Sequence, residues 1–167
     1  IEDIPLKVLS GAELFLSDDI LKASNLDDLA INNSRYMLCE FPLGPFNIKR
    51  GLLWIDELIE RGYTPIIAHP ERYNFVKNDV TCINRLSDMG VLFQVNAGSP
   101  AGAFGDYEMQ VACAMINGGF VDFIGSDAHR LNIRNTDIDF FLERYPDVVD
   151  MRLVRKALLE NPSVILN

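Results

Sequence analysis

The chain contains two histidines, and each follows a short apolar segment with the composition of a buried strand. His69 comes directly after residues 65–68, and His129 ends an Asp-x-His motif that begins at Asp127. In extended backbone, Asp-x-His directs its carboxylate and its imidazole to the same face, because side chains alternate along a strand. These two donor types together suit Zn²⁺, Mn²⁺ or Fe, although Asp-x-His alone also occurs by chance.

Two glutamates extend this set of candidate metal ligands. Glu13 and Glu40 each lie near the end of an apolar segment, where a buried charge is costly unless a cation or a partner compensates it. Together with Asp127, His69 and His129, they would provide carboxylates and imidazoles for more than one divalent ion.

Arginines lie close in sequence to both histidines. Arg72 follows His69 by three residues, and Arg134 follows His129 by five. A guanidinium binds phosphate oxygens through charge-assisted hydrogen bonds, so an arginine among metal ligands indicates a phosphorylated substrate. Two alternatives stay open. The arginines could simply neutralise nearby acidic groups, or they could form, with Arg130, an ion-pair rim in place of a metal site.

The pattern of apolar residues predicts an alternation of strands and helices. Short, continuously apolar segments predict buried parallel strands at Lys7–Leu14, Tyr36–Glu40, Pro65–Ala68, Val91–Asn96 and Phe120–Gly125. Amphipathic segments predict helices at Asn47–Arg61, Asp79–Met89, Asp106–Asn117, Thr136–Arg144 and Met151–Glu160, with a weaker pattern at Asp18–Asn25. Strands separated by helices imply right-handed βα units and therefore an α/β sheet or barrel.

The candidate ligands lie at one end of these predicted strands. Glu40, His69, Asn96 and Asp127 each end or closely follow a strand, and Glu13 lies near the end of the first. In α/β barrels the carboxyl ends of the strands and the loops after them form the active face. We therefore expect these side chains to converge.

Composition limits the class of protein. The 167 residues, of which 49% are hydrophobic and 23% charged, predict one soluble globular domain over residues 1–167. A formal net charge of -9 argues against unaided binding to nucleic acid or to anionic membranes. No apolar run approaches the ~20 residues of a membrane span, which predicts that the chain does not insert into membranes. Composition makes no prediction about oligomeric state.

The cysteines argue against thiol chemistry. Cys39, Cys82 and Cys113 share no metal-binding spacing, and they are interpreted as reduced thiols of a cytoplasmic protein. None is followed by arginine in the Cys-x5-Arg pattern, which excludes the loop of cysteine-dependent tyrosine phosphatases.

Several motifs resemble those of one bacterial family. The segments Ala68–Tyr73, Gln94–Ser99 and Gly125–Arg130 are similar to the tyrosine phosphatases of capsule and exopolysaccharide operons that belong to the PHP (polymerase and histidinol phosphatase) superfamily. Gly11–Glu13 and Leu38–Pro42 fit the same pattern in the same order, so the resemblance covers essentially the whole chain.

The resemblance implies a fold, a cofactor and a substrate. The fold would be an α/β protein of the PHP type, a distorted (β/α)7 barrel, with a metal cluster at the carboxyl ends of its strands. The metal would typically be Mn²⁺, with Fe, Zn, Co or Mg also compatible. The substrate would be a phosphotyrosine protein, namely a bacterial tyrosine autokinase of capsular or exopolysaccharide biosynthesis. By motif, Glu13 resembles a bridging ligand, Glu40, His69, Asp127 and His129 resemble further ligands, and Arg72 and Arg134 resemble the phosphate-binding arginines.

The sequence departs from the family pattern at its start. The family begins with His-x-His and a Pro-Gly-x-x-Asp-Gly segment, followed by a further ligand before the Glu13 position, and none of these occurs here. Roughly the first two βα units of the barrel are therefore absent. Ile at position 1 and the intact remainder favour a fragment of a longer enzyme over a shortened relative.

Two other functions remain open. The protein could be a PHP hydrolase of a small phosphomonoester such as histidinol phosphate or a nucleotide. Alternatively, the absence of His-x-His could make it a catalytically inactive PHP binding module.

Overall fold

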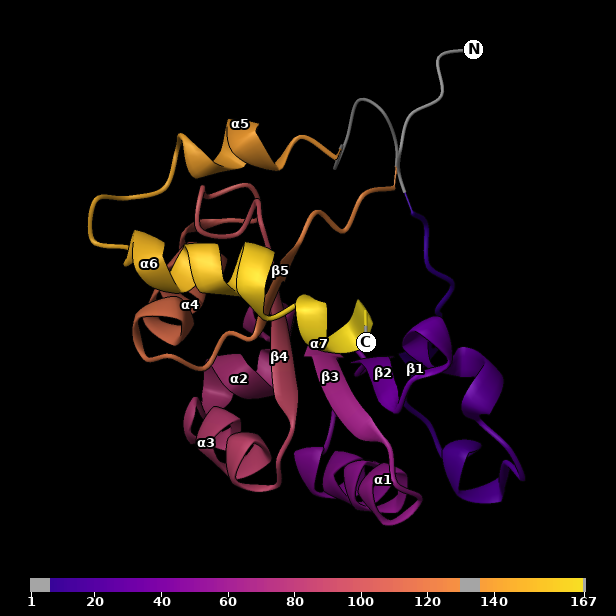
Figure 1. The fold of residues 1–167 in the computed structure, drawn as a ribbon. Coiled ribbons are helices and arrows are strands. Elements are labelled where there is room, and N and C mark those ends of the chain that lie inside the picture. The colour runs from indigo at the N-terminus through magenta and orange to yellow at the C-terminus, as the bar shows by residue number, and fades with distance from the viewer. Residues whose placement is uncertain (1–6, 130–135, 167) are drawn as a thin grey trace.

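The computed structural model describes residues 7–129 and 136–166, and in this part of the chain the strands form one parallel sheet. The strands lie in sequence order, and each pairs in parallel with the next (Figure 1). Their bounds are β1 (Glu13–Phe15), β2 (Tyr36–Glu40), β3 (Thr64–Ala68), β4 (Leu92–Asn96) and β5 (Phe123–Gly125). The predicted α/β class with parallel strands is confirmed.

Helices lie between and after the strands. The α-helices are α1 (Ile48–Glu60), α2 (Asn74–Asn78), α3 (Thr81–Asp88), α4 (Asp106–Asn117), α5 (Ile138–Leu142), α6 (Met151–Arg155) and α7 (Ser163–Leu166). Short 3-10 turns are η1 (Ile20–Lys22), η2 (Asp27–Leu29), η3 (Ile31–Asn33) and η4 (Pro70–Arg72), and η5 (Lys156–Glu160) is a π-helical turn. The predicted helix Met151–Glu160 is therefore α6 continued by this π turn.

Local chemistry accounts for several helix ends. The side chain of Asn47 accepts a hydrogen bond from Lys49 N–H, so it caps α1 where the amphipathic pattern begins. Gly62, with a φ of 88°, follows α1 and provides the left-handed backbone that ends many helices. Asp137 and Asp150 cap α5 and α6 in the same way as Asn47.

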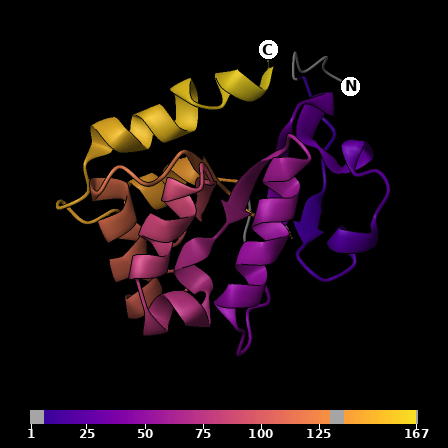
Figure 2. The same ribbon diagram turned by 90° about the horizontal axis from the view of Figure 1, so that it is seen from below.

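The main core lies between the sheet and the helices α1, α3 and α4. Met37, Cys39, Ile67 and Phe93 are buried on that face of the sheet and belong to one cluster with residues of these helices, such as Leu58. Burial of one such large side chain contributes about 1.5–3 kcal/mol. The C-terminal helices α6 and α7 run along the opposite side of the molecule from α1 and α3 (Figure 2).

The first predicted strand is wrong over most of its length. Lys7–Leu14 was expected to be extended, but β1 begins only at Glu13. The backbone before β1 is hydrogen-bonded to the 3-10 turns η2 and η3. Ala12 N–H donates to Leu29 O (3.3 Å), and Asn32 N–H donates to Ser10 O (2.8 Å). Glu13 consequently starts a short strand.

Three other predicted elements are clearly shorter than expected, among them the helix Thr136–Arg144, which forms only as α5. The strand Phe120–Gly125 begins at Phe123, because Phe120 N–H donates to Met115 O (3.0 Å) and so completes the end of α4. The weak helical pattern at Asp18–Asn25 forms only the turn η1. In the described residues, no helix combines the length and the apolar character needed to cross a bilayer.

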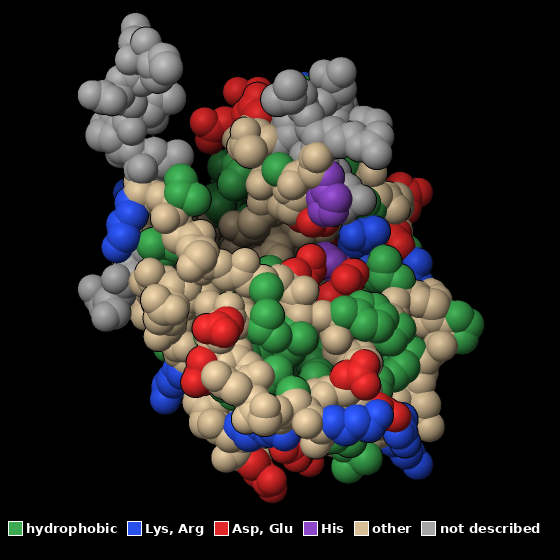
Figure 3. All heavy atoms as spheres, turned by 90° about the vertical axis from the view of Figure 1, so that its right-hand side faces the viewer, with side chains coloured by type: hydrophobic (Ala, Val, Ile, Leu, Met, Phe, Trp, Pro, Cys, Tyr) green, Lys and Arg blue, Asp and Glu red, His purple; other side chains and the backbone are tan. Residues whose placement is uncertain are grey.

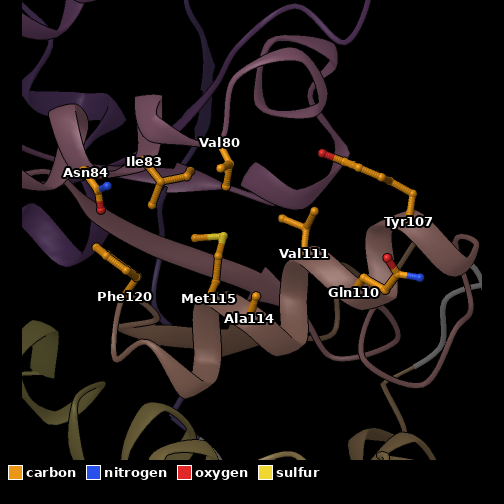
Figure 4. Close-up of a pocket in the computed structure, with 9 residues that line it drawn as sticks. All are labelled: Val80, Ile83, Asn84, Tyr107, Gln110, Val111, Ala114, Met115 and Phe120. Atoms are coloured by element: carbon orange, nitrogen blue, oxygen red, sulfur yellow. The ribbon is translucent and has the colours of Figure 1, made fainter.

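An apolar pocket of about 310 Å³ lies between α3 and α4 (Figure 4). Ile83, Val111, Met115 and Phe120 supply much of its lining. No candidate metal ligand lines it, so it is separate from the predicted site.

Candidate metal centre

Three of the predicted ligands come together on three neighbouring strands: Glu13 begins β1, Glu40 ends β2 and His69 directly follows β3. The prediction that Glu13 lies near the end of its strand is therefore wrong. His69 Nε2 lies 3.4 Å from Glu13 Oε1 and 3.4 Å from Glu40 Oε1. One ligand atom from each residue lies within 4.8 Å of the others, a spacing that a single metal ion can bridge. We call Glu13, Glu40 and His69 the triad.

The backbone of His69 determines how the triad forms. In register, Leu38 pairs with both Glu13 and Ile66, so these residues and Glu40 lie on one face of the sheet. Strict alternation beyond β3 would place His69 on the other face. Instead, His69 adopts a left-handed conformation with a φ of 36°, and its ring reaches both glutamates. Such backbone costs about 1–3 kcal/mol and often occurs at functional sites.

The triad concentrates negative charge. Burial raises the pKa of Glu13, and the nearby carboxylates of Glu40 and Asp127 raise it further, whereas His129 and Arg72 act in the opposite direction. A cation would relieve this repulsion, since an opposite charge at short range favours the ionised form of a carboxyl group.

Asp127 and His129 form a second group beside the triad. His129 Nδ1 lies 3.4 Å from Asp127 Oδ1 and 2.8 Å from the carbonyl oxygen of Asp127. Asp127 lines the same hollow of about 410 Å³ as Glu13. Imidazoles, acidic side chains and basic side chains gather on this face of the molecule (Figure 3).

Arg72 lies at the edge of this second group. Its Nη1 is 3.7 Å from Asp127 Oδ2, and its guanidinium lies 5.0 Å from the centre of the Phe104 ring. Arg72 follows His69 through the turn η4, which explains how a short sequence spacing places a ligand and a guanidinium together. Arg134 and Arg130 lie outside the described residues.

Sequence reasoning missed Glu71, which is completely buried between His69 and Arg72 in the chain. Burial raises its pKa to about 7, although hydrogen bonds from Ser99 and from backbone N–H groups oppose the shift. The sequence does contain an indication of this role, because Glu71 lies between the two candidate site residues His69 and Arg72, directly after a buried strand.

The thiols are unsuited to nucleophilic catalysis. Cys39, Cys82 and Cys113 are free and buried. Burial raises the pKa of all three, that of Cys82 to about 11, so each stays protonated near neutral pH. This agrees with the absence of Cys-x5-Arg from the sequence.

The fold and the site together define an α/β protein with a candidate divalent-metal centre formed at the start of β1 and at the carboxyl ends of β2 and β3. More particularly, the chain belongs to the CpsB/CapC family of capsular polysaccharide synthesis, whose profile matches residues 1–167. The family resemblance predicted from the motifs is confirmed.

Characterised relatives agree with this assignment. The chain is 33% identical over 135 residues to the tyrosine-protein phosphatase YwqE of Bacillus subtilis (strain 168), covering 80% of this chain and 53% of YwqE. It is 27% identical over 173 residues to the tyrosine-protein phosphatase CpsB of Streptococcus pneumoniae, covering 96% of this chain and 68% of CpsB. The chain thus spans about half the length of YwqE and about two thirds of CpsB.

A solved structure shares the fold. This structure belongs to a set of crystal structures of YwqE from Bacillus subtilis and CpsB from Streptococcus pneumoniae, which are described as unique metal-dependent tyrosine phosphatases. The match has a TM-score of 0.71 at 29% identity and covers 99% of this chain and 64% of the other.

Proposed function

We propose that this chain provides the metal-binding and phosphate-binding part of a metal-dependent protein-tyrosine phosphatase. The observation that carries the proposal is the triad, together with the Asp127–Arg72 pair whose charges act on Glu13 of the triad. Relatives that are named tyrosine-protein phosphatases support the reaction, and the solved structure's description as metal-dependent supports the cofactor.

The donor set fits a divalent cation such as Mn²⁺, with Fe, Zn, Co or Mg as alternatives. Carboxylate oxygens and imidazole nitrogens suit these ions, and crowded carboxylates at Glu13 favour a cation. In this proposal the ligands are Glu13, Glu40, His69, Asp127 and His129. When bound, such ions supply an activated water and neutralise phosphate oxygens.

The chain's own residues bind and orient the phosphate. Arg72 can present its N–H groups to the phosphate oxygens, while Asp127, 3.7 Å away, fixes the direction of its guanidinium. Arg134 would provide a second guanidinium. His69 and His129 act as ligands and not as free acids. A phenolate leaves readily, so hydrolysis of tyrosine phosphate requires little help from a general acid.

We also propose that the parallel sheet is the major part of a PHP-type distorted (β/α)7 barrel, and that residues 1–167 belong to a single PHP domain. The strands in sequence order support this assignment. His-x-His does not occur in these residues, and in this proposal the first two βα units of that barrel are missing from them. The substrate in the cell would be a cytoplasmic tyrosine autokinase of capsular or exopolysaccharide biosynthesis.

Metal removal and restoration tests the proposed function. The protein, stripped with a chelator and then supplied with Mn²⁺, should release phosphate from a phosphotyrosine peptide only after the metal is restored. Faster turnover of histidinol phosphate would instead favour a small-molecule phosphoesterase. Failure to bind any divalent ion at high manganese, measured by mass spectrometry, would favour a binding module.

A further inference from the structure

A buried carboxylate connects the loop after β3 to the loop after β4. Glu71 has no exposed surface, and isolation of such a group from water is costly unless hydrogen bonds compensate it. Its Oε1 accepts hydrogen bonds from Asn96 N–H (3.1 Å) and from the hydroxyl of Ser99 (2.6 Å). Both donors are buried, so solvent does not weaken these contacts.

Asn96 extends this connection to the loop after β5. Its Oδ1 accepts a hydrogen bond from Gln94 Nε2 (3.1 Å), and its Nδ2 donates to Asp127 Oδ2 (3.0 Å). Because both ends of the amide are engaged, rotation of the side chain would lose both bonds. Asn96 thereby provides one of the contacts that orient the Asp127 carboxylate.

Gly125 provides the space that this arrangement needs. It pairs with Asn96 in the sheet, and a Cβ atom at Gly125 would lie 3.2 Å from Gln94 Nε2. A side chain there would displace Gln94, which orients Asn96. The three loops are therefore connected through a series of buried or partly buried polar contacts that ends at Asp127.

We propose that Glu71 is a positioning residue, which acts through Asn96 to hold the Asp127 carboxylate at the candidate metal centre beside Arg72. The inference rests on the proposed function, because it assigns Asp127 as a metal ligand. Loss of residues that orient metal ligands typically lowers metal affinity by about 10–100-fold. We expect a loss of this size when the acceptor at position 71 is removed.

Two substitutions of similar size separate positioning from simple packing. Glu71→Met removes the acceptor, whereas Glu71→Gln keeps an oxygen that Asn96 N–H and Ser99 can reach. Mn²⁺ affinity, measured by titration calorimetry, should fall about 10–100-fold in Glu71→Met and much less in Glu71→Gln. Without metal, hydrogen exchange of residues 96–99 and 126–129 should be faster in Glu71→Met alone. Ser99→Ala, which removes one donor, is the second variant if Glu71→Met fails to fold.

Leu86→Ala is the matched control, because Leu86 is buried in α3 and belongs to the main core. It should lower the Tm without changing Mn²⁺ affinity. Equal loss of affinity in Leu86→Ala and Glu71→Met at equal loss of Tm would overturn the proposal. So would wild-type exchange of residues 126–129 in Glu71→Met, a readout that needs no metal. Wild-type protein that binds Mn²⁺ but does not hydrolyse phosphotyrosine would refute the proposed function and leave the role of Glu71 intact.

Discussion

The two halves of the candidate centre are held in place in different ways. Glu13 and Glu40 lie in adjacent strands, His69 directly follows the next strand, and the His69 side chain is only 4% exposed. Asp127 and His129 follow β5, where the His129 side chain is 56% exposed. Sheet register therefore positions Glu13 and Glu40, and the left-handed backbone directly after β3 positions His69, whereas loop hydrogen bonds, including the one from Asn96, position the second half.

This difference predicts how each half of the centre responds to amino-acid substitutions. Two of the three triad ligands, Glu13 and Glu40, lie in paired strands and stay in place while the sheet is folded, because strand pairing involves many residues. A carboxylate oriented by a few hydrogen bonds depends on each donor. We therefore expect the triad to keep some cation affinity when Asp127 or His129 is substituted. We do not expect Asp127 and His129 to bind a cation when the triad is altered.

The largest effect should come from His69→Ala. The imidazole lies 3.4 Å from both glutamates of the triad, so its removal takes away a ligand and leaves two carboxylates close together. Mn²⁺-dependent hydrolysis of a phosphotyrosine peptide should be lost, while circular dichroism should show an intact fold. Full turnover in this variant would mean that His69 is a structural histidine.

Asp127→Ala should also abolish turnover, but it should leave the triad able to bind a cation. The expected result is a lower molar ratio of bound Mn²⁺ that does not reach zero, measured by mass spectrometry after dialysis. Complete loss of metal from Asp127→Ala would show that the two halves bind metal as one unit. It would contradict the expectation that the triad binds a cation without Asp127.

Arg72→Ala should weaken phosphate binding and spare metal binding. A hydrogen bond to a charged group contributes about 1.5–3 kcal/mol, which corresponds to a roughly 10–100-fold rise in KM. Steady-state kinetics with a phosphotyrosine peptide would measure the change in KM. Arg72→Lys, which keeps the positive charge but lacks the planar guanidinium, would show how much of the effect is due to charge alone. Unaltered kinetics in Arg72→Ala would make this residue only an ion-pair partner of Asp127.

Gly125→Ala should have a smaller effect, confined to the Asp127 half. The added methyl group would crowd Gln94 Nε2 at 3.2 Å, and overpacking of this kind costs about 1–3 kcal/mol. Mn²⁺ titration should show weaker binding with the triad still occupied. An unchanged titration would show that Gln94 can move without disturbing Asn96.

The smallest effect should come from Asp150→Ala, far along the chain from either half. Asp150 caps α6, and its hydrogen bond with Arg152 lowers the pKa of the Asp150 carboxyl to about 2. A lowered pKa means that this contribution is present above the ordinary value of 3.8 and is lost as pH falls through about 2. The variant should have a slightly lower Tm at pH 7, the same Tm as wild type at very low pH, and unchanged Mn²⁺ affinity. A change in affinity would link α6 to the centre.

The order and type of most elements can be predicted from the amino-acid sequence. Apolar runs that end in polar residues predicted the parallel strands, and the helix Asp106–Asn117 has the predicted bounds. The position of Glu40 and His69 at strand ends was also readable, because parallel strands bring their carboxyl ends to one edge. These features depend on local periodicity, which a linear sequence records directly.

The way in which the side chains of the site meet depends on the folded chain. The left-handed backbone at His69 overrides strand alternation, and it persists because surrounding contacts hold it. The hydrogen bonds that Ser99 donates to Glu71 and that Asn96 donates to Asp127 join residues 28 and 31 positions apart. The shortness of β1 likewise depends on pairing with Leu29 and Asn32. Contacts between distant segments form only in the folded chain, so no periodicity in the sequence encodes them.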